Sequence, residues 1–287
     1  MVKALQQNPS LILEGGTFRT VYTAGVLDYF LENDLHMPYI VGISAGAISA
    51  CSYASKQHER TFRVIANFRN DKRYIGFQNF FKKDRSYFGL DFSYNVIPNV
   101  IDRFDWETFR AHDGDVFFGV TNAYTGEVEY MNGKDMDATC QMLRATCAIP
   151  LLFPEIKLNG TPYYDGGLSE PIPIQKAMQD GYSKHVIVLT QPKGYEKAMD
   201  GKSKWVVKLF ERKYPKLAAQ MKQRAARYNE TLRYIEQLER EGRAFVFRPS
   251  YAVSSFEKDR FQLKRNYDMG YDLAKTRFEE LQAFLAQ

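Results

Sequence analysis

Cysteine and histidine are scarce in this chain of 287 residues, which has only three of the first and four of the second. No two cysteines form a CxxC pair, and an odd number does not suit a disulfide framework, so a reducing compartment is expected. The seven side chains also lack the spacing of a zinc site, and no metal centre is expected. Candidate functional residues must therefore be sought among other side chains.

A strong charge of one sign is also lacking. The chain has 39 Lys and Arg against 34 Asp and Glu, a net charge of +5, which is too small by itself to indicate a nucleic-acid partner. Hydrophobic residues make up 45% and charged residues 25%, so a disordered, collagen-like or coiled-coil chain is excluded. The length suits one large α/β domain or two small ones.

Long hydrophobic runs are missing as well. Residues 1–10 contain no apolar run and therefore do not resemble a secretory signal. The stretch from Leu35 to Ser55 is free of Asp, Glu, Lys and Arg over the length of a membrane span, but it contains Pro38, two glycines and four serines. We interpret it as a buried strand and helix, so no transmembrane segment is expected.

Short apolar segments alternate with amphipathic ones along most of the chain. Strands are expected at 11–13, 39–41, 116–120, 127–131, 185–190 and 244–247, the third and fourth forming a hairpin. Helices are expected at 21–33, 46–54 and 136–148, and a long helical region runs from 202 to about 242 with a break at Pro215. Strands separated by helices predict an α/β fold with a mainly parallel sheet and helices on both faces.

The sequence Gly42-Ile43-Ser44-Ala45-Gly46 is a G-x-S-x-G motif. It follows one predicted strand and opens a predicted helix, which is the context of a nucleophile elbow. At a helix N-terminus the free N–H groups favour a negative charge near the serine. A small-residue turn below the sheet is the alternative interpretation.

Gly15 and Gly16 directly follow the first strand, and paired glycines there expose backbone N–H groups that suit an oxyanion or a phosphate. A plain tight turn would look the same. The dinucleotide motif G-x-G-x-x-G is not satisfied, because positions 17 and 20 are both threonine.

Asp165, followed by Gly166 and Gly167, is either part of a turn or a base held on a loop. A Ser-Asp-His triad would need a histidine after the aspartate, and only His185 qualifies. It begins an apolar strand rather than a loop, so we disfavour a triad.

Two segments break the alternating pattern. Residues 74–94 contain eight aromatic side chains, which either pack into the core or form a lid or the wall of an acyl-chain site. Residues 202–227 contain nine basic residues and one acid, with Trp205, Val206, Val207, Leu209 and Phe210 among them. This stretch predicts either a basic amphipathic helix on an anionic membrane or a helix docked on the sheet with solvated charges.

Together the three motifs resemble those of the patatin-like phospholipase family, in the family's order: Leu11 to Arg19, Val41 to Gly46, and Tyr164 to Gly167. The resemblance covers roughly residues 10–195. It implies a three-layer α/β/α sandwich, with a catalytic core at 1–195 and a largely helical extension at 196–287, whose strand near 244–248 rejoins the sheet.

Family membership implies a Ser–Asp dyad without histidine, in which Ser44 is the nucleophile and Asp165 the general base. The amides of Gly15, Gly16 and Thr17 would form the oxyanion hole, and no metal ion or organic cofactor is required. Arg19, Gly42, Gly46, Gly166 and Gly167 match further motif positions. The family has glycine where this chain has Thr17 and Thr20, and a β-branched residue does not suit a positive φ.

The resemblance therefore implies a serine carboxylic-ester hydrolase that cleaves acyl esters of phospholipids or other lipids. A catalytically weak lipid-binding or scaffolding protein that retains the fold is the alternative. The expected partners are a lipid or acyl-ester substrate and an anionic membrane surface, and not nucleic acid. The expected location is cytoplasmic, with peripheral contact at the inner face of the membrane.

Overall fold

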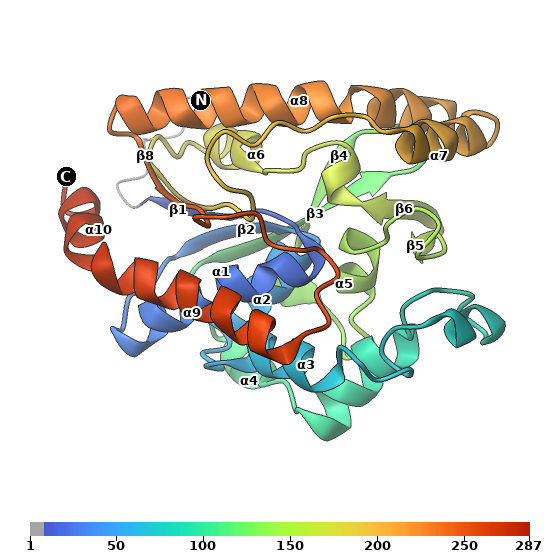
Figure 1. The fold of residues 1–287 in the computed structure, drawn as a ribbon, viewed down its shortest axis with the longest axis horizontal. Helices are drawn as coiled ribbons and strands as arrows, with labels where there is room; N and C mark the ends of the chain where they lie inside the picture. Colours follow the sequence, from blue (N-terminus) through green and yellow to red (C-terminus); the bar gives the residue numbers. More distant parts are fainter. Residues whose placement is uncertain (1–8) are drawn as a thin grey trace.

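The computed structural model describes residues 9–287, so the first eight residues, part of the stretch without a secretory signal, lie outside the described chain. Its centre is an eight-stranded sheet in the order β5-β6-β3-β2-β1-β7-β8, with β4 paired to β3 (Figure 1). The strands are β1 (Ser10–Leu13), β2 (Tyr39–Ile43), β3 (Asp115–Asn122), β4 (Val128–Asn132), β5 (Ile156–Leu158), β6 (Thr161–Asp165), β7 (His185–Val188) and β8 (Ala244–Phe247).

Five neighbouring strands, β3-β2-β1-β7-β8, run parallel, and β4, β5 and β6 add antiparallel pairs at one side. The predicted mainly parallel sheet and the β3–β4 hairpin are confirmed. Strands β5 and β6 were not predicted, because β5 has only three residues and β6 contains Pro162, which lacks an N–H donor. These two strands lead the chain to Asp165.

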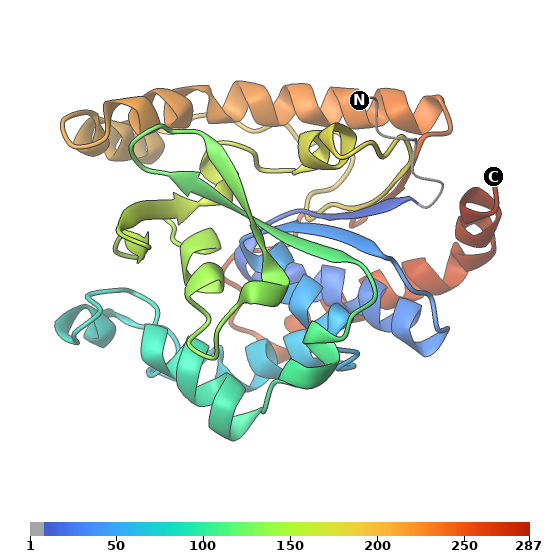
Figure 2. The same cartoon turned by 180° about the vertical axis from the view of Figure 1, so that it is seen from behind.

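Helices cover both faces of the sheet, which gives three layers (Figures 1 and 2). Helices α6 and α8 lie on one face over a core that includes Ile12, Val41 and Ile187. Helices α1, α2 and α9 lie on the other face over Leu11, Leu13 and Ile40. The helices are α1 (Thr20–Glu32), α2 (Ala45–Ala54), α3 (Arg60–Phe68), α4 (Trp106–Arg110), α5 (Gln141–Thr146), α6 (Ile174–Gln179), α7 (Gly201–Glu211), α8 (Pro215–Arg240), α9 (Arg260–Thr276) and α10 (Phe278–Leu285).

The C-terminal part of the chain contacts both faces of the sheet and also joins it. Strand β8 pairs in parallel with β7, while α8 and α9 pack on opposite faces. Helices α1 and α9 cross at two glycines: a Cβ atom at Gly25 would lie 2.1 Å from the carbonyl oxygen of Tyr267, and one at Gly270 would lie 2.1 Å from that of Tyr22. The division of the chain at residue 195 stays a prediction.

The predicted helix over 136–148 is wrong in extent, because the structure has only α5 over Gln141–Thr146. Cys140 has a φ of 53°, which a continuous α-helix does not allow. The side chain of Asp137 accepts hydrogen bonds from the amide and hydroxyl of Thr139 and stabilises a turn there instead. The break in the 202–242 helical region is confirmed, with Pro215 as the first residue of α8.

The helices of residues 9–287 include none that is both long and apolar enough to cross a bilayer. The uncharged stretch from Leu35 to Ser55 forms β2 and α2 in the interior, as expected.

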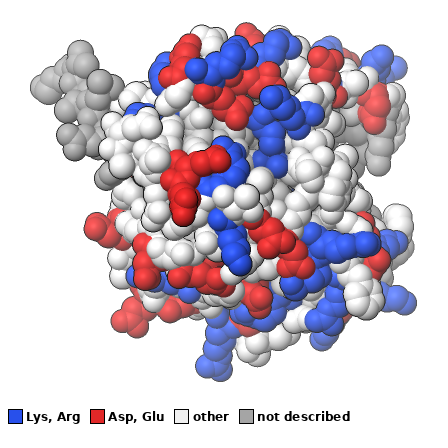
Figure 3. All heavy atoms as spheres, turned by 60° about the vertical axis from the view of Figure 1, so that its left-hand side comes forward, with Lys and Arg blue, Asp and Glu red and all other residues white. Residues whose placement is uncertain are grey.

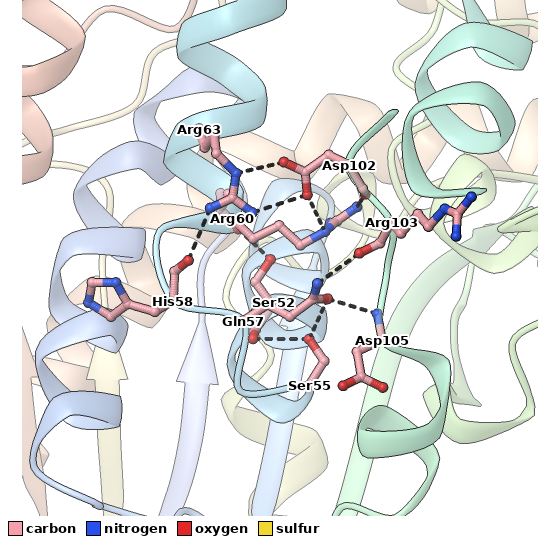
Figure 4. A network of polar contacts seen from close by, with 10 residues as sticks. Ser52, Ser55, Gln57, His58, Arg60, Arg63, Asp102, Arg103 and Asp105 are labelled. Atoms are coloured by element: carbon pink, nitrogen blue, oxygen red, sulfur yellow. Dashed lines mark hydrogen bonds and ion pairs between the residues drawn. The ribbon is translucent and has the colours of Figure 1, made fainter. Parts of the chain in front are cut away.

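A carboxylate shared between two arginines fastens helix α3 to the segment that follows residues 92–101 (Figure 4). Asp102 accepts two hydrogen bonds from Arg63, at 2.7 and 3.1 Å, and its Oδ1 lies 3.3 Å from Nε of Arg60. The Arg60 and Asp102 side chains are only 9% and 13% exposed. This ion-pair network joins α3 to the segment that follows the π-helix Phe92–Ile101.

Replacing the shared carboxylate should destabilise the fold. We expect Asp102→Asn to lower the free energy of unfolding by roughly 3 kcal/mol, because it leaves the buried guanidinium of Arg60 without a counter-charge. Urea unfolding followed by circular dichroism measures this change. The matched control is Asp113→Asn, an exposed aspartate in the next loop, for which the change should stay within about 0.5 kcal/mol. Equal effects of the two variants would contradict a role for the network.

Candidate active site

Ser44 lies in the turn between β2 and α2 with a φ of 54° and a ψ of −125°. This strained conformation for a residue with a side chain is that of a sharp strand-to-helix turn. A Cβ atom at Gly42 would lie 2.7 Å from the backbone nitrogen of Ala47, and one at Gly46 would lie 2.4 Å from the carbonyl oxygen of Leu13. Both glycines of the motif are therefore required by space.

The turn is also attached to α5 and β3. The backbone N–H of Ser44 donates to Oγ1 of Thr146 at 2.9 Å, and the Thr146 hydroxyl donates to the carbonyl oxygen of Gly119 at 2.6 Å. Sequence analysis did not find Thr146, because no local pattern links it to a serine 102 positions away.

Asp165 ends β6, and its carboxylate interacts with the side chain of Ser44. Its Oδ1 also accepts from the backbone N–H of Gly167 at 2.8 Å. Burial raises the pKa of Asp165 above its usual range, while the hydrogen bonds from Ser44 and Gly167 and the charge of Arg224 lower it. A carboxylate with a raised pKa is a better proton acceptor than a free aspartate.

The four histidines all fall within the described residues, and none of them lines the cavity at Ser44. His185 is fully buried at the start of β7, where its Nδ1 lies 2.8 Å from the hydroxyl of Ser10. Burial lowers the pKa of His185 to about 4. This histidine is a neutral core side chain, and its position gives no support to a triad.

The loop after β1 lies directly against the turn at Ser44. A Cβ atom at Gly15 would be 3.0 Å from the Cβ atom of Ser44. Within residues 9–287, no protein group accepts a hydrogen bond from the backbone N–H groups of Gly15, Gly16 or Thr17. Free amides beside a serine hydroxyl can stabilise the negative charge that develops on a carbonyl oxygen.

The two threonines of this loop differ in conformation. Thr17 has a φ of 55°, the left-handed region that favours glycine, whereas Thr20 has a φ of −61° and begins α1. The Thr20 hydroxyl donates to the carbonyl oxygen of Ala45 at 3.1 Å and lies 2.7 Å from the hydroxyl of Ser49. Of the two threonines, only Thr17 has a backbone conformation that favours glycine. Thr20 instead adds contacts to the helix that follows Ser44.

Helix α8 contacts the loops after both β1 and β6. The buried Glu14 accepts a hydrogen bond from the Tyr228 hydroxyl at 2.8 Å, and Nε of Arg224 donates to the carbonyl oxygen of Gly167 at 2.5 Å. The next basic residue of α8, Arg227, donates to the carbonyl oxygen of Ser169. Both arginines belong to the basic stretch 202–227, for which the sequence predicts charges that face a membrane or solvent. That prediction is wrong for Arg224 and Arg227.

The remaining motif residues fasten the loops. Arg19 donates from Nε to the Thr190 hydroxyl at 3.3 Å and from Nη1 to the Ser255 hydroxyl, while Thr190 donates to the carbonyl oxygen of Gly15. A Cβ atom at Gly166 would lie 2.3 Å from the carbonyl oxygen of Gly119, so only glycine fits there.

An apolar cavity opens at Ser44, and we call it the Ser44 cavity. Three aromatic residues of the segment 74–94, namely Tyr74, Phe88 and Tyr94, line it, whereas Phe77 and Phe81 of the same segment are exposed. The segment therefore forms part of a cavity wall as well as part of the surface. Other lining residues are Thr17, Phe18, Thr20, Ala45, Ile48, Arg60, Ile65, Cys147 and Phe153.

A second cavity adjoins the Ser44 cavity at Ile149, which lines both. Its wall comes from residues 149–152, from the segment before α7, and from α7 and α8. Two cationic residues, Lys197 and Arg224, stand among otherwise largely apolar lining residues. The aromatic segment 74–94 indicated a wall of an acyl-chain site as one of its two interpretations, whereas no sequence pattern indicated the second cavity.

A family model described as "Patatin-like phospholipase" matches residues 11–178, and one described as "Domain of unknown function (DUF6363)" matches residues 214–286. In Escherichia coli (strain K12), "Uncharacterized protein YjjU" is 24% identical over 186 residues, which are 64% of this chain and 52% of that protein. The chain thus spans about half the length of this curated relative.

Among solved structures, the crystal structure of VipD from Legionella pneumophila is similar, with a TM-score of 0.50 and 12% sequence identity. The match covers 96% of this chain and 67% of that one, and at this identity it shows the fold alone.

Glycine substitutions at the two threonines should have opposite effects on stability. Thr17→Gly should raise the free energy of unfolding by roughly 1 kcal/mol, because it relieves the left-handed conformation of a β-branched residue. Thr20→Gly should lower it by roughly 1–2 kcal/mol, because it removes two hydrogen bonds and weakens the first turn of α1. Thermal unfolding of both variants measures the contrast. A loss of stability in Thr17→Gly would contradict the strain at this position.

Proposed function

The chain belongs to the patatin-like phospholipase family, and from its site we propose that it is a serine hydrolase that cleaves acyl esters of lipids through Ser44 and Asp165. The observation that carries this proposal is the interaction of the Ser44 side chain with the buried Asp165 carboxylate, next to the free amides of residues 15–17. The apolar Ser44 cavity suits an acyl chain.

In the first half of the reaction, Oγ of Ser44 attacks the ester carbonyl carbon while its proton passes to the Asp165 carboxylate. The amides of Gly15, Gly16 and Thr17 donate hydrogen bonds to the carbonyl oxygen as it becomes negative. The ester C–O bond then breaks, the leaving alcohol takes the proton from Asp165, and an acyl-Ser44 ester remains.

In the second half, a water molecule gives a proton to Asp165 and attacks the acyl-Ser44 ester. The fatty acid leaves, and the proton returns to Oγ of Ser44. A free aspartate, with a pKa of about 3.9, is a weak base at neutral pH. Burial, which raises the pKa of Asp165, and the preorganised amides compensate for this weakness.

Turnover of a soluble short-chain ester tests the two roles. Ser44→Ala should abolish labelling by a fluorophosphonate probe, because the nucleophilic oxygen is gone. Asp165→Asn should reduce kcat by roughly 10²–10⁴-fold, because it keeps the shape of the side chain but cannot accept the proton.

The control for this test is His185→Gln, which should retain turnover within a factor of about two. Greater loss in His185→Gln than in Asp165→Asn would favour a triad and reject the dyad. A wild-type protein that shows neither labelling nor turnover would leave lipid binding as the function of the fold.

We also propose that one end of the molecule contacts an anionic membrane. On α7, Trp205 and Leu209 are 56% and 47% exposed, whereas Val207 is buried. Phe77 and Phe81 are 75% and 92% exposed on a segment at the same end of the molecule, the right side of Figure 1 and the left side of Figure 2. Three exposed basic residues, Lys204, Lys208 and Arg212, lie near Trp205 and Leu209 in the sequence. Three others, Lys82, Lys83 and Arg85, follow Phe81.

Exposed aromatic side chains flanked by cations are typical of surfaces that bind the bilayer interface. By contrast, the face in Figure 3 mixes acidic and basic side chains without a broad patch of one sign. Val206 and Phe210 are half-buried, and the Phe210 ring packs edge-on against the Tyr164 ring with their centroids 5.2 Å apart. Helix α7 thus docks by one side and leaves the other side free for a membrane.

Charge reversal on α7 tests the membrane contact. We expect Lys204→Glu, Lys208→Glu and Arg212→Glu together to weaken sedimentation with anionic liposomes at low salt, because each basic residue contributes about 1 kcal/mol near such a surface. Hydrolysis of a soluble ester should be unchanged.

The control carries the same charge change at three exposed residues elsewhere, Lys56→Glu, Arg240→Glu and Lys275→Glu. Equal losses in the two triple variants would mean that overall charge, and not α7, determines binding.

A further inference from the structure

The second cavity adjoins the Ser44 cavity and borders the loop that follows Asp165. It adjoins the Ser44 cavity at Ile149, and its wall includes Leu168, which follows the Asp165–Gly167 loop. Two adjoining cavities therefore lie close to the Ser44–Asp165 pair. One of them is suited to the acyl chain, and the other remains for the part released as an alcohol.

The two cations of the second cavity form no ion pair in the described chain, although Arg224 is attracted by the nearby carboxylates of Asp165 and Glu14. None of the ion pairs within residues 9–287 includes Lys197 or Arg224. Burial, together with the charges of Arg224 and Arg19, lowers the pKa of Lys197 to about 8, although Glu14 and Asp200 act in the opposite direction. Two neighbouring cations in a largely apolar cavity repel each other, and a bound anion would relieve that repulsion.

The two cations are also held in position. The backbone N–H of Lys197 donates to the side-chain oxygen of Asn229 at 2.7 Å, and the Asn229 side-chain nitrogen donates back to the carbonyl oxygen of Lys197 at 3.0 Å. The Lys197 ammonium lies 5.1 Å from the ring centroid of Tyr228. Arg224 is fixed by its hydrogen bond to Gly167. Both groups are therefore preorganised by α8 rather than free on the surface.

We propose that the second cavity binds the phosphodiester group of a phospholipid through Lys197 and Arg224, while the scissile acyl chain occupies the Ser44 cavity. Guanidinium and ammonium groups are the side chains that bind phosphate oxygens most strongly. The apolar part of the wall, including Met199, Val206 and Met221, contacts the rest of the lipid. This inference rests on the proposed function for the assignment of the scissile ester, and it makes Lys197 the residue that distinguishes phospholipids from neutral glycerolipids.

Lys197 is the better position for a test, because Arg224 also contacts the loop that carries Asp165. Binding is measured by calorimetry in the Ser44→Ala background, with dihexanoylphosphatidylcholine below its micelle concentration and with dihexanoylglycerol. A dissolved zwitterionic lipid avoids attraction by a charged membrane. Lys197→Gln should weaken binding of the phospholipid about tenfold, because a charge-assisted hydrogen bond is lost, and should leave binding of the neutral lipid unchanged.

The matched control is Lys193→Gln, an exposed lysine of the same segment outside the cavity lining, which should bind both lipids as the parent does. Equal effects of Lys197→Gln on the two lipids, or no effect on either, would overturn the proposal. Binding of inorganic phosphate that depends on Lys197, without such dependence for the phospholipid, would assign the site to a free anion and also overturn it. Because binding is measured without Ser44, absence of ester turnover by the wild type would reject the proposed function separately.

Discussion

The candidate site depends on the close contact between the end of β1 and the turn at Ser44. Gly46 lies so near β1 that a Cβ atom there would be 2.4 Å from the carbonyl oxygen of Leu13, and Gly15 leaves a similarly small space beside Ser44. Strands β2 and β7 lie on opposite sides of β1. The chain adds β2 and β3 on one side of β1 and later adds β7 and β8 on the other side. The loops after β1 and β2 therefore meet at the point where the strand order reverses. Ligands of open parallel sheets bind at such a point, outside the carboxyl ends of the strands.

Helix α8 supports this contact from one face of the sheet. Its Tyr228 binds the carboxylate of Glu14 at the end of β1, and its Arg224 binds the carbonyl oxygen of Gly167 after β6. One rigid helix thereby holds the loop with the free amides and the loop with Asp165 at a fixed separation. The region matched by the model of unknown function, 214–286, thus contributes contacts to the site of the family to which the chain belongs.

The two cavities that adjoin at Ile149 differ in charge, and the difference corresponds to the two ends of an amphiphile. The Ser44 cavity is mostly apolar, and its one lining arginine, Arg60, is turned to Asp102. The second cavity has two cations, Lys197 and Arg224, that form no ion pair in the described chain. In surroundings of low dielectric constant such a difference orients a ligand strongly, because a misplaced phosphate would lose its counter-charges.

The sequence by itself determined the local features: the parallel α/β pattern, the strand–turn–helix at Ser44, the glycine loop after β1 and Asp165 as a candidate base. Each of these depends on residues within a few positions of one another, so propensity and steric limits suffice to predict them. Only the tertiary structure decided that Thr146 supports Ser44, that Arg224 and Lys197 face a cavity, and that α5 begins at Gln141. These outcomes depend on contacts between distant segments, and on a positive φ at Cys140 that no periodic pattern indicates.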